Sequence, residues 1–375
     1  MSLGRLAVLI ASGTLAAAGT GISCSSARPG GQDNTPIKSS PSPGSTRGPN
    51  GEKATAASVL RLTSGDVAKV RAGSYSAALV WHDESDFTEA VTAGVRDEFR
   101  VLGIRVVAQT TAGFDAAKQK ADIETVEAKK PDVMLTLPVD PVITASAYKQ
   151  AAREGTKIVL LSNLPQGMSY GRDYVTVVTD DLFDMGKRAA DALAAAVHGK
   201  GEVGYFFLDQ NSFVANQRDQ AFLKTMRANY PQIKIAASQG IADPNQAQQQ
   251  ANATLVKHPD LSGVYVTFSQ PPGEGVLAAL RANGNTTTKI VSLDLDEPLA
   301  LDMAKRGHSF ALIVDRAYDL GQAMAKSAAY GLLGRQAPPF VIVPALTVTR
   351  ANLVEGYRES LRRAPPASVM KALGK

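Results

Sequence analysis

The sequence has 375 residues, of which 40 are Lys or Arg and 35 are Asp or Glu, so the formal net charge is +5. The positive charge is spread along the chain and forms no basic cluster, so we expect no nucleic-acid partner. Hydrophobic residues make up 44% and charged residues 20%, which is an ordinary globular composition. The single Cys excludes both a disulfide framework and a cysteine-based zinc site.

The N-terminus has the pattern of an export signal. After a positive charge, residues 6–18 form a charge-free run that is too short to span a membrane. The sequence Gly-Ile-Ser-Cys at 21–24 then resembles the lipobox of bacterial lipoproteins, although that pattern usually carries an aliphatic residue where Gly21 stands. We predict a signal peptide over residues 1–23 and a lipid anchor on Cys24. The alternative is an unmodified Cys in a leader.

Residues 24–58 are predicted to be a lipidated, flexible linker. Between residues 25 and 53 there are five Pro, five Gly and six Ser, and Ile37 is the only aliphatic residue larger than Ala. A segment of this composition cannot bury enough apolar surface to form a core. We therefore expect it to tether the folded part while leaving that part free to rotate.

From residue 76 onward, short apolar runs alternate with amphipathic segments, which predicts an α/β fold with parallel sheets. The runs predict five strands in a first half, at 77–81, 106–108, 133–137, 158–161 and 175–178. They predict five more in a second half, at 203–208, 233–236, 264–268, 290–293 and 309–314. Ten strands in a chain of this length favour two domains over one.

Catalytic and cofactor motifs fail in their sequence context. Gly199, Gly201 and Gly204 have the spacing of a dinucleotide fingerprint, but they precede a strand instead of opening a helix. The Gly-x-Ser-x-Gly pattern at 167–171 also leads into a strand, unlike a nucleophile elbow. The four His residues never fall at metal-ligand spacings. We predict no enzymatic activity, no metal and no cofactor.

Polar residues stand where the predicted strands end, which is where open parallel sheets place their ligand sites. Carboxylates and amides can pair with neighbouring hydroxyl groups of a ligand, and an aromatic ring can cover its apolar face. The alternative is that strand-end acids cap helices, which we favour for Asp86 and Asp140 but not for Asp294 and Asp315. The candidates at strand ends include His82, Asp83, Ser162, Asn163, Ser269, Gln270, Asp294 and Asp315.

Residues from about 76 to 349 resemble the ribose- and galactose-type (type I) periplasmic binding proteins of bacterial ABC importers. The resemblance rests on the order and spacing of four features: the opening strand, loop and helix with Phe87, the Pro-Val-Asp turn at 138–140, the Ala-Asn-Gln-Arg helix start at 215–218, and Asp294. It implies two Rossmann-like lobes with parallel sheets, joined by a three-stranded hinge.

The resemblance also implies boundaries for the lobes and the hinge. The N-terminal lobe would comprise residues 75–179 and 316–345, and the C-terminal lobe residues 180–315 and 346–375. The chain would cross between the lobes near 179–181, 315–316 and 344–346.

Carried over residue by residue, the resemblance implies ligand contacts at Trp81, Ser85, Phe87, Ser162, Asn163, Asn216 or Arg218, Ser269, Asp294 and Asp315. Sugar binders commonly carry Asp-Arg where this chain has Ser162-Asn163, and Asn-Asp where it has Ser269-Gln270, so the identity of the sugar or polyol stays open. Trp81 has a second interpretation, as a packing residue at the end of a strand.

The expected function is that of an exported solute-binding protein, lipid-anchored on the outer face of the cell membrane or in the periplasm. It would bind a monosaccharide or polyol as a monomer and deliver it to an ABC permease. The alternative is a sensor that presents the bound small molecule to a membrane signalling receptor.

Overall fold

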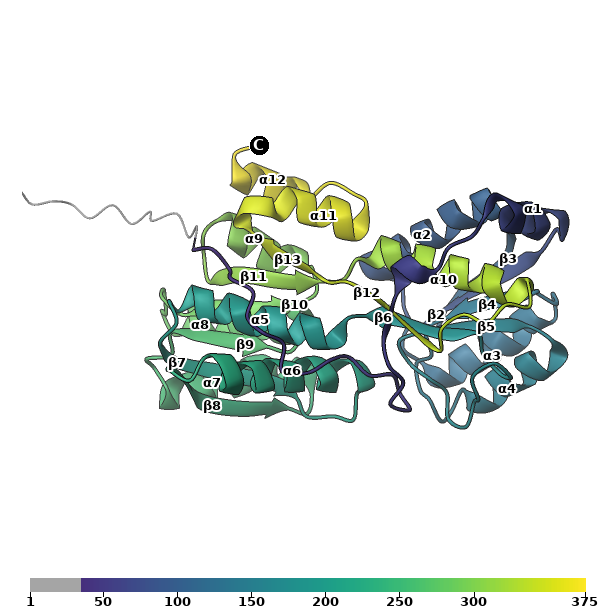
Figure 1. Ribbon diagram of the computed structural model, residues 1–375. Coiled ribbons are helices and arrows are strands. Elements are labelled where there is room, and N and C mark those ends of the chain that lie inside the picture. The colour runs from purple at the N-terminus through teal and green to yellow at the C-terminus, as the bar shows by residue number, and fades with distance from the viewer. Residues whose placement is uncertain (1–34) are drawn as a thin grey trace, which may run out of the picture. The chain divides into compact units, whose positions relative to one another are not determined.

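The computed structural model describes residues 35–375, which form two α/β lobes, each built on one sheet (Figure 1). The predicted signal peptide over residues 1–23 and the predicted lipidation at Cys24 lie outside the described residues. Over 35–375, no helix combines the length and the apolar character needed to cross a membrane.

The first lobe contains a seven-stranded sheet in the order β1-β12-β6-β5-β4-β2-β3, and every neighbouring pair of strands is parallel. The strands are β1 (Thr55–Ala56), β2 (Ser76–Trp81), β3 (Arg105–Thr111), β4 (Val133–Thr136), β5 (Lys157–Leu161), β6 (Thr176–Asp180) and β12 (Phe340–Val343). The helices of this lobe are α1 (Ser64–Ala72), α2 (Asp86–Leu102), α3 (Ala116–Glu127), α4 (Ala145–Glu154) and α10 (Ala317–Leu332), with the short 3-10 helix η1 (Ala57–Val59).

The second lobe contains a six-stranded sheet in the order β13-β11-β10-β9-β7-β8, in which only the β11–β13 pair is antiparallel among the described strands. The strands are β7 (Gly201–Leu208), β8 (Ile233–Ile241), β9 (Gly263–Val266), β10 (Lys289–Leu293), β11 (Ser309–Val314) and β13 (Leu346–Thr349). The helices are α5 (Leu182–Ala196), α6 (Phe213–Asn229), α7 (Ala247–Lys257), α8 (Glu274–Ala282), α9 (Glu297–Ala304), α11 (Leu353–Leu361) and α12 (Ala367–Leu373), with short turns η2 (Pro244–Gln246), η3 (Ser269–Gly273) and η4 (Arg350–Asn352).

The predicted α/β fold is confirmed, and its two sheets contain all ten predicted strands. The strands are apolar because helices cover both faces of each sheet; β4 and β11, for example, are buried along their whole length. Helix α2 shows how the apolar periodicity works, since Val91, Val95 and Phe99 all face the core. The chain passes between the sheets after β6, after β11 and after β12, which are the three predicted crossings.

The segment predicted as a flexible linker differs from that expectation over its described part. Residues 35–53, here called the N-terminal arm, pack along α5 and α6 of the second lobe (Figure 1). The chain then enters the first lobe, where β1 pairs with β12. The arm is thus a fourth connection between the lobes. Its composition lacks the apolar residues of a core, but its attachment uses hydrogen bonds instead, which hydrophobic patterning does not reveal.

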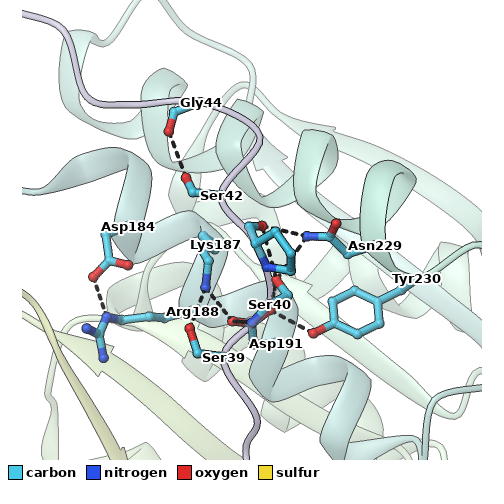
Figure 2. Close-up of polar contacts among 11 residues, drawn as sticks. Ser39, Ser40, Ser42, Gly44, Asp184, Lys187, Arg188, Asp191, Asn229 and Tyr230 are labelled. Carbon is cyan, nitrogen blue, oxygen red and sulfur yellow. Dashed lines mark hydrogen bonds and ion pairs between the residues drawn. The ribbon is translucent and has the colours of Figure 1, made fainter.

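One end of the arm is fastened to a buried carboxylate on α5 (Figure 2). Asp191 accepts hydrogen bonds from the backbone N–H and the hydroxyl of Ser40, at 3.1 and 2.6 Å. It also accepts from Tyr230 at 2.7 Å and forms an ion pair with Lys187 at 2.8 Å. Asn229 donates to the Ser40 hydroxyl at 2.9 Å. Without Ser40, the buried carboxylate of Asp191 would lose two of its hydrogen bonds, so Ser40 completes this polar network.

The other end of the arm is fastened beside the first crossing between the lobes. The hydroxyl of Thr46, which is 2% exposed, bonds to the carboxylate of Asp181 and accepts from the backbone N–H of Phe183 at 2.8 Å. Asp181 is the N-cap of α5, so Thr46 satisfies a second free amide in the first turn of that helix. Gln217 on α6 then exchanges two hydrogen bonds with the backbone of Arg47.

We expect Ser40→Ala to lower the free energy of unfolding by about 1.5–3 kcal/mol, because the lost hydrogen bond ends on a buried charged group. Urea unfolding measures this change. Ser42→Ala is the matched control, because the Ser42 hydroxyl is exposed and donates to Gly44 within the arm itself, so its effect should stay within about 0.5 kcal/mol. Equal effects of the two substitutions would contradict the attachment through Asp191.

Candidate functional site

A cavity of about 600 Å³ lies where the carboxyl ends of strands from both sheets meet. Loops after β2, β4 and β5 line it from the first lobe, and α6 with the loops after β9, β10 and β11 line it from the second. Its lining residues are His82, Asp83, Ser85, Asp86, Phe87, Leu137, Ser162, Asn163, Asp180, Ser212, Val214, Arg218, Ser269, Gln270, Glu274, Asp294, Leu295, Asp296, Glu297, Pro298 and Asp315.

Most of the residues predicted from the sequence come together in this cavity. Those that line it are His82, Asp83, Ser85, Phe87, Ser162, Asn163, Arg218, Ser269, Gln270, Asp294 and Asp315. The two exceptions, Trp81 and Asn216, are not among the lining residues.

Trp81 is a core residue of the first lobe, so the prediction that it contacts ligand is not supported by its position. Its side chain is 1% exposed and packs among the buried residues around α2. Successive side chains of an extended strand point to opposite sides. Because His82 faces the cavity, Trp81 at the preceding position turns inward.

Asn216 lies on α6 on the side away from the cavity. Residues two positions apart on a helix are separated by about 200° around its axis, whereas residues four apart share a face. Val214 and Arg218 both line the cavity, and Asn216 between them does not. The resemblance left Asn216 and Arg218 as alternatives, and of the two only Arg218 lines the cavity.

The wall from the first lobe is organised by Asp83. It accepts hydrogen bonds from Thr88 at 2.7 Å and from Ser85 at 3.3 Å, and it lies 3.1 Å from Nε2 of His82. Ser85 is also the N-cap of α2, so the start of this helix fixes the loop. Burial lowers the pKa of His82, which Asp83 only partly offsets, so the ring is neutral at pH 7.

The loop after β5 has an unusual backbone conformation. Ser162 has φ 61°, in the left-handed region that costs energy for a residue with a Cβ. Two backbone hydrogen bonds hold it, from Ser162 to Val178 at 2.8 Å and from Asn163 to Leu161 at 2.7 Å. Asn163 also donates its side-chain N–H to Pro138 at 2.9 Å. Strained residues held in this way are concentrated at ligand clamps.

The floor from the second lobe is built around Arg218, whose side chain is 8% exposed. Its Nη1 lies 2.9 Å from Oδ1 of Asp294. Helix α6 can approach α5 here because Gly186 has no side chain: a Cβ on Gly186 would lie 2.0 Å from the carbonyl oxygen of Arg218. Burial acts to lower the pKa of Arg218, but Asp294 and Asp315 outweigh it and raise the pKa, so the guanidinium stays charged.

Two carboxyl groups meet at the hinge beside Arg218. Asp180 ends β6 at the first crossing and Asp315 follows β11 at the second, so each carboxyl group affects the pKa of the other. Burial raises the pKa of Asp315 to about 7, with repulsion from Asp294 adding and Arg218 opposing. Burial and Asp315 likewise raise the pKa of Asp180 well above its ordinary value. Asp180 and Asp315 therefore bind protons at a higher pH than ordinary carboxylates do.

Ser269 positions another residue and has no free donor for a ligand. It is 1% exposed, and its hydroxyl lies 2.8 Å from the carbonyl of Leu293 and 2.9 Å from that of Asp294. Asp294 itself has φ 67°, so these bonds hold a second left-handed residue in the site. Its carboxylate remains partly open to the cavity, with 36% of the side chain exposed.

Several lining residues were missed by the sequence analysis. Asp180 extends β6 two residues beyond the predicted strand end, so the strand-end rule could have found it. Glu274 opens α8 after the irregular turn η3 and carries no such signal. Asp296 was missed as well; it is the N-cap of α9, and its Oδ1 accepts a hydrogen bond from the backbone N–H of Leu299 at 3.2 Å. The cavity therefore contains more acids than predicted.

The arrangement is suited to binding through hydrogen bonds, because charged and polar groups converge on it from two lobes beside the ring of Phe87. Within residues 35–375 there is no group of three or more His, Cys, Asp or Glu placed to hold a metal ion.

Comparison with known proteins gives one family and many similar structures. A family model described as a periplasmic binding protein domain matches residues 77–336. No curated protein matches the sequence significantly.

Three of the similar solved structures illustrate the likeness. An arabinose binding protein, AraP, from Geobacillus stearothermophilus has a TM-score of 0.69 at 20% identity, covering 76% of this chain and 99% of its own. The sugar-binding protein of a sugar ABC transporter from Bacillus halodurans has a TM-score of 0.67 at 22% identity, covering 76% and 100%. A solute binding protein of an ABC transporter from Agrobacterium vitis, bound with alpha-D-tagatopyranose, has a TM-score of 0.64 at 23% identity, covering 75% and 96%.

Proposed function

The chain belongs to the periplasmic binding protein family, and we propose that it is the extracytoplasmic solute-binding protein of an ABC importer. It would bind a monosaccharide or polyol between its lobes and deliver it to a membrane permease, without catalysis. The observation that carries this proposal is the cavity of about 600 Å³, lined from both lobes by carboxylates, amides and hydroxyls.

The printed descriptions of similar proteins support the ligand class. The similar structures include proteins described with bound tagatopyranose, D-arabinose, D-allose and allitol, the last a polyol. Each has a TM-score of at least 0.61 to this chain. The fold of this chain is therefore one that accommodates such ligands in other proteins.

The topology supports transport through closure of the lobes. A ligand that touches both walls of the cavity favours the state in which the walls are close, by its difference in affinity for the two states. The crossings after β6 and β11 carry Asp180 and Asp315 into the cavity wall. Ligand contact at these residues would act directly on the hinge.

A thermal-shift screen over pentoses, hexoses, polyols and amino acids, followed by calorimetry, tests the binding function. A ligand that binds only the native state raises the melting temperature. We expect Phe87→Ala to weaken binding of the identified ligand by about 1–3 kcal/mol through lost apolar contact. Val256→Ala, at a side chain exposed on α7, is the control and should bind normally. If no sugar or polyol stabilises the protein, or if an amino acid alone does, the proposed ligand class is wrong.

We also propose that the protein is exported and held at the membrane by lipid on Cys24, as its sequence predicts. Cys24→Ala should then move the protein from the membrane fraction to the soluble fraction, with unchanged ligand affinity, because Cys24 is far in sequence from the cavity residues. Fractionation followed by immunoblotting measures this. Identical fractionation of the two proteins would contradict the anchor.

A further inference from the structure

The lining of the cavity is strongly acidic. Asp83, Asp180, Glu274, Asp294, Asp296 and Asp315 all face it, together with Asp86 and Glu297 at its edge. Arg218 is the one Lys or Arg among the described lining residues, and it is already paired with Asp294. His82 adds no charge at pH 7, because burial lowers its pKa. A neutral ligand would leave these acidic groups without a cationic partner.

We propose that the natural ligand is a sugar or cyclitol that carries an ammonium group, with its amine placed between Asp294 and the Glu274–Asp296 pair. This inference rests on the proposed sugar-binding function and narrows its ligand class. It assigns the neutral hydroxyl groups of the ligand to the remaining amides and hydroxyls of the walls.

The Glu274–Asp296 pair has carboxyl oxygens available for a cation. Asp296 uses Oδ1 to cap α9, while its Oδ2 is buried and has no hydrogen-bond partner among the described residues. Burial raises the pKa of Asp296 to about 7, and the nearby charges of Glu274 and Asp294 add to this effect. An ammonium group supplies three donors and a positive charge at the place where three carboxylates repel one another.

A second, independent feature lies deeper in the cavity. Asp180 is 5% exposed, lines the cavity, and has one oxygen, Oδ1, that is buried without a partner in the described part of the chain. A buried acceptor of this kind costs free energy unless a ligand satisfies it. A donor-rich ligand that reaches from Asp294 toward the hinge would supply the missing hydrogen bond.

Other charged ligands fit the lining poorly. A sugar acid or sugar phosphate would bring negative charge against these carboxylates, with Arg218 already engaged by Asp294 at 2.9 Å. A metal ion would need a convergent set of ligands, and residues 35–375 contain none.

Matched series of ligands test the proposal by calorimetry. The probes are D-glucosamine, D-galactosamine and D-mannosamine, each with its neutral parent hexose and its N-acetyl derivative, and 2-deoxystreptamine with myo-inositol. We expect at least one amine to bind about tenfold or more tightly than both neutral partners. We also expect protons to be released on binding near pH 7, so that the measured heat depends on the ionisation enthalpy of the buffer.

Glu274→Gln separates charge from shape, because it keeps the size of the side chain. It should weaken binding of the amine about tenfold and change binding of the neutral parent less than threefold. Glu124→Gln, on the exposed face of α3, removes the same charge far from the cavity and should change neither. A neutral sugar that binds as tightly as its amine, or equal losses for both ligands in Glu274→Gln, would overturn the inference while leaving the sugar-binding function intact. Absence of binding by every probe would overturn the inference, and the sugar-binding function falls with it only if the thermal-shift screen also finds no sugar or polyol that stabilises the protein.

Discussion

Arg218→Ala is expected to lower the free energy of unfolding of the free protein by about 3–5 kcal/mol at pH 7.5. The substitution removes the cationic partner of buried carboxylates and leaves their charge uncompensated. The guanidinium is 8% exposed and pairs with Asp294, and its charge also opposes the rise in the pKa values of Asp180, Asp315 and Asp219. Urea unfolding measures the loss. At pH 5 the loss should be smaller, since protonation neutralises part of the acidic cluster.

Arg172→Ala provides the matched control for this prediction. Arg172 also pairs with an aspartate, Asp173, at 2.8 Å, but its side chain is 72% exposed. Exposed ion pairs contribute about 0–1 kcal/mol, so this substitution should have little effect. Similar small losses for both arginines would show that Arg218 does not hold the acidic cluster together.

Asp315→Asn is expected to stabilise the free protein while it weakens ligand binding. Above pH 7 the ionised Asp315 is buried and is repelled by Asp294, and an amide removes both costs. We expect a gain of about 1–2 kcal/mol in the free energy of unfolding at pH 8. Binding should weaken by about 1.5–3 kcal/mol, because a charged acceptor for the ligand is lost.

The pH dependence of stability shows why Asp315→Asn should raise the free energy of unfolding instead of lowering it. Burial raises the pKa of Asp315 in the folded protein to about 7, above the ordinary value of 3.8. Between these values the folded state holds more protons than the unfolded state, so this group makes the wild-type protein lose stability as the pH rises from about 4 to 7. Asp315→Asn should flatten that part of the profile. A variant that is less stable than the wild type at pH 8 would contradict the prediction.

Much of the fold could be predicted because its strands are buried on both faces and are therefore continuously apolar. The short strands β1, β12 and β13 were missed for a physical reason: β1 has only two residues, and β12 and β13 are four-residue runs on either side of Pro344. The N-terminal arm was assigned to a linker because hydrophobic patterning does not register attachment through Ser40 and Thr46.

Only those cavity residues that follow the end of a strand could be predicted from the sequence. That rule identified His82, Asp294 and Asp315, because parallel strands bring their carboxyl ends to one edge. It could not find Glu274, which reaches the cavity from the start of a helix after an irregular turn. For a strand buried on both faces, such as β2, the sequence also does not say which side chains face the cavity. This is why Trp81, a buried residue outside the cavity lining, was included among the predicted contacts.

If Cys24 carries the proposed lipid, the attachment of the N-terminal arm limits how far the folded body can lie from it. If the chain were free up to residue 58, it could span about 120 Å when fully extended. Because Ser40 is bound to Asp191 on α5, only the 16 residue steps from Cys24 to Ser40 remain, which reach at most about 55 Å. The segment between Cys24 and the folded body is therefore less than half as long as a free chain up to residue 58 would be, and it joins the folded body at the second lobe. A binding protein confined to so short a radius would meet a permease in the same membrane at a high effective concentration.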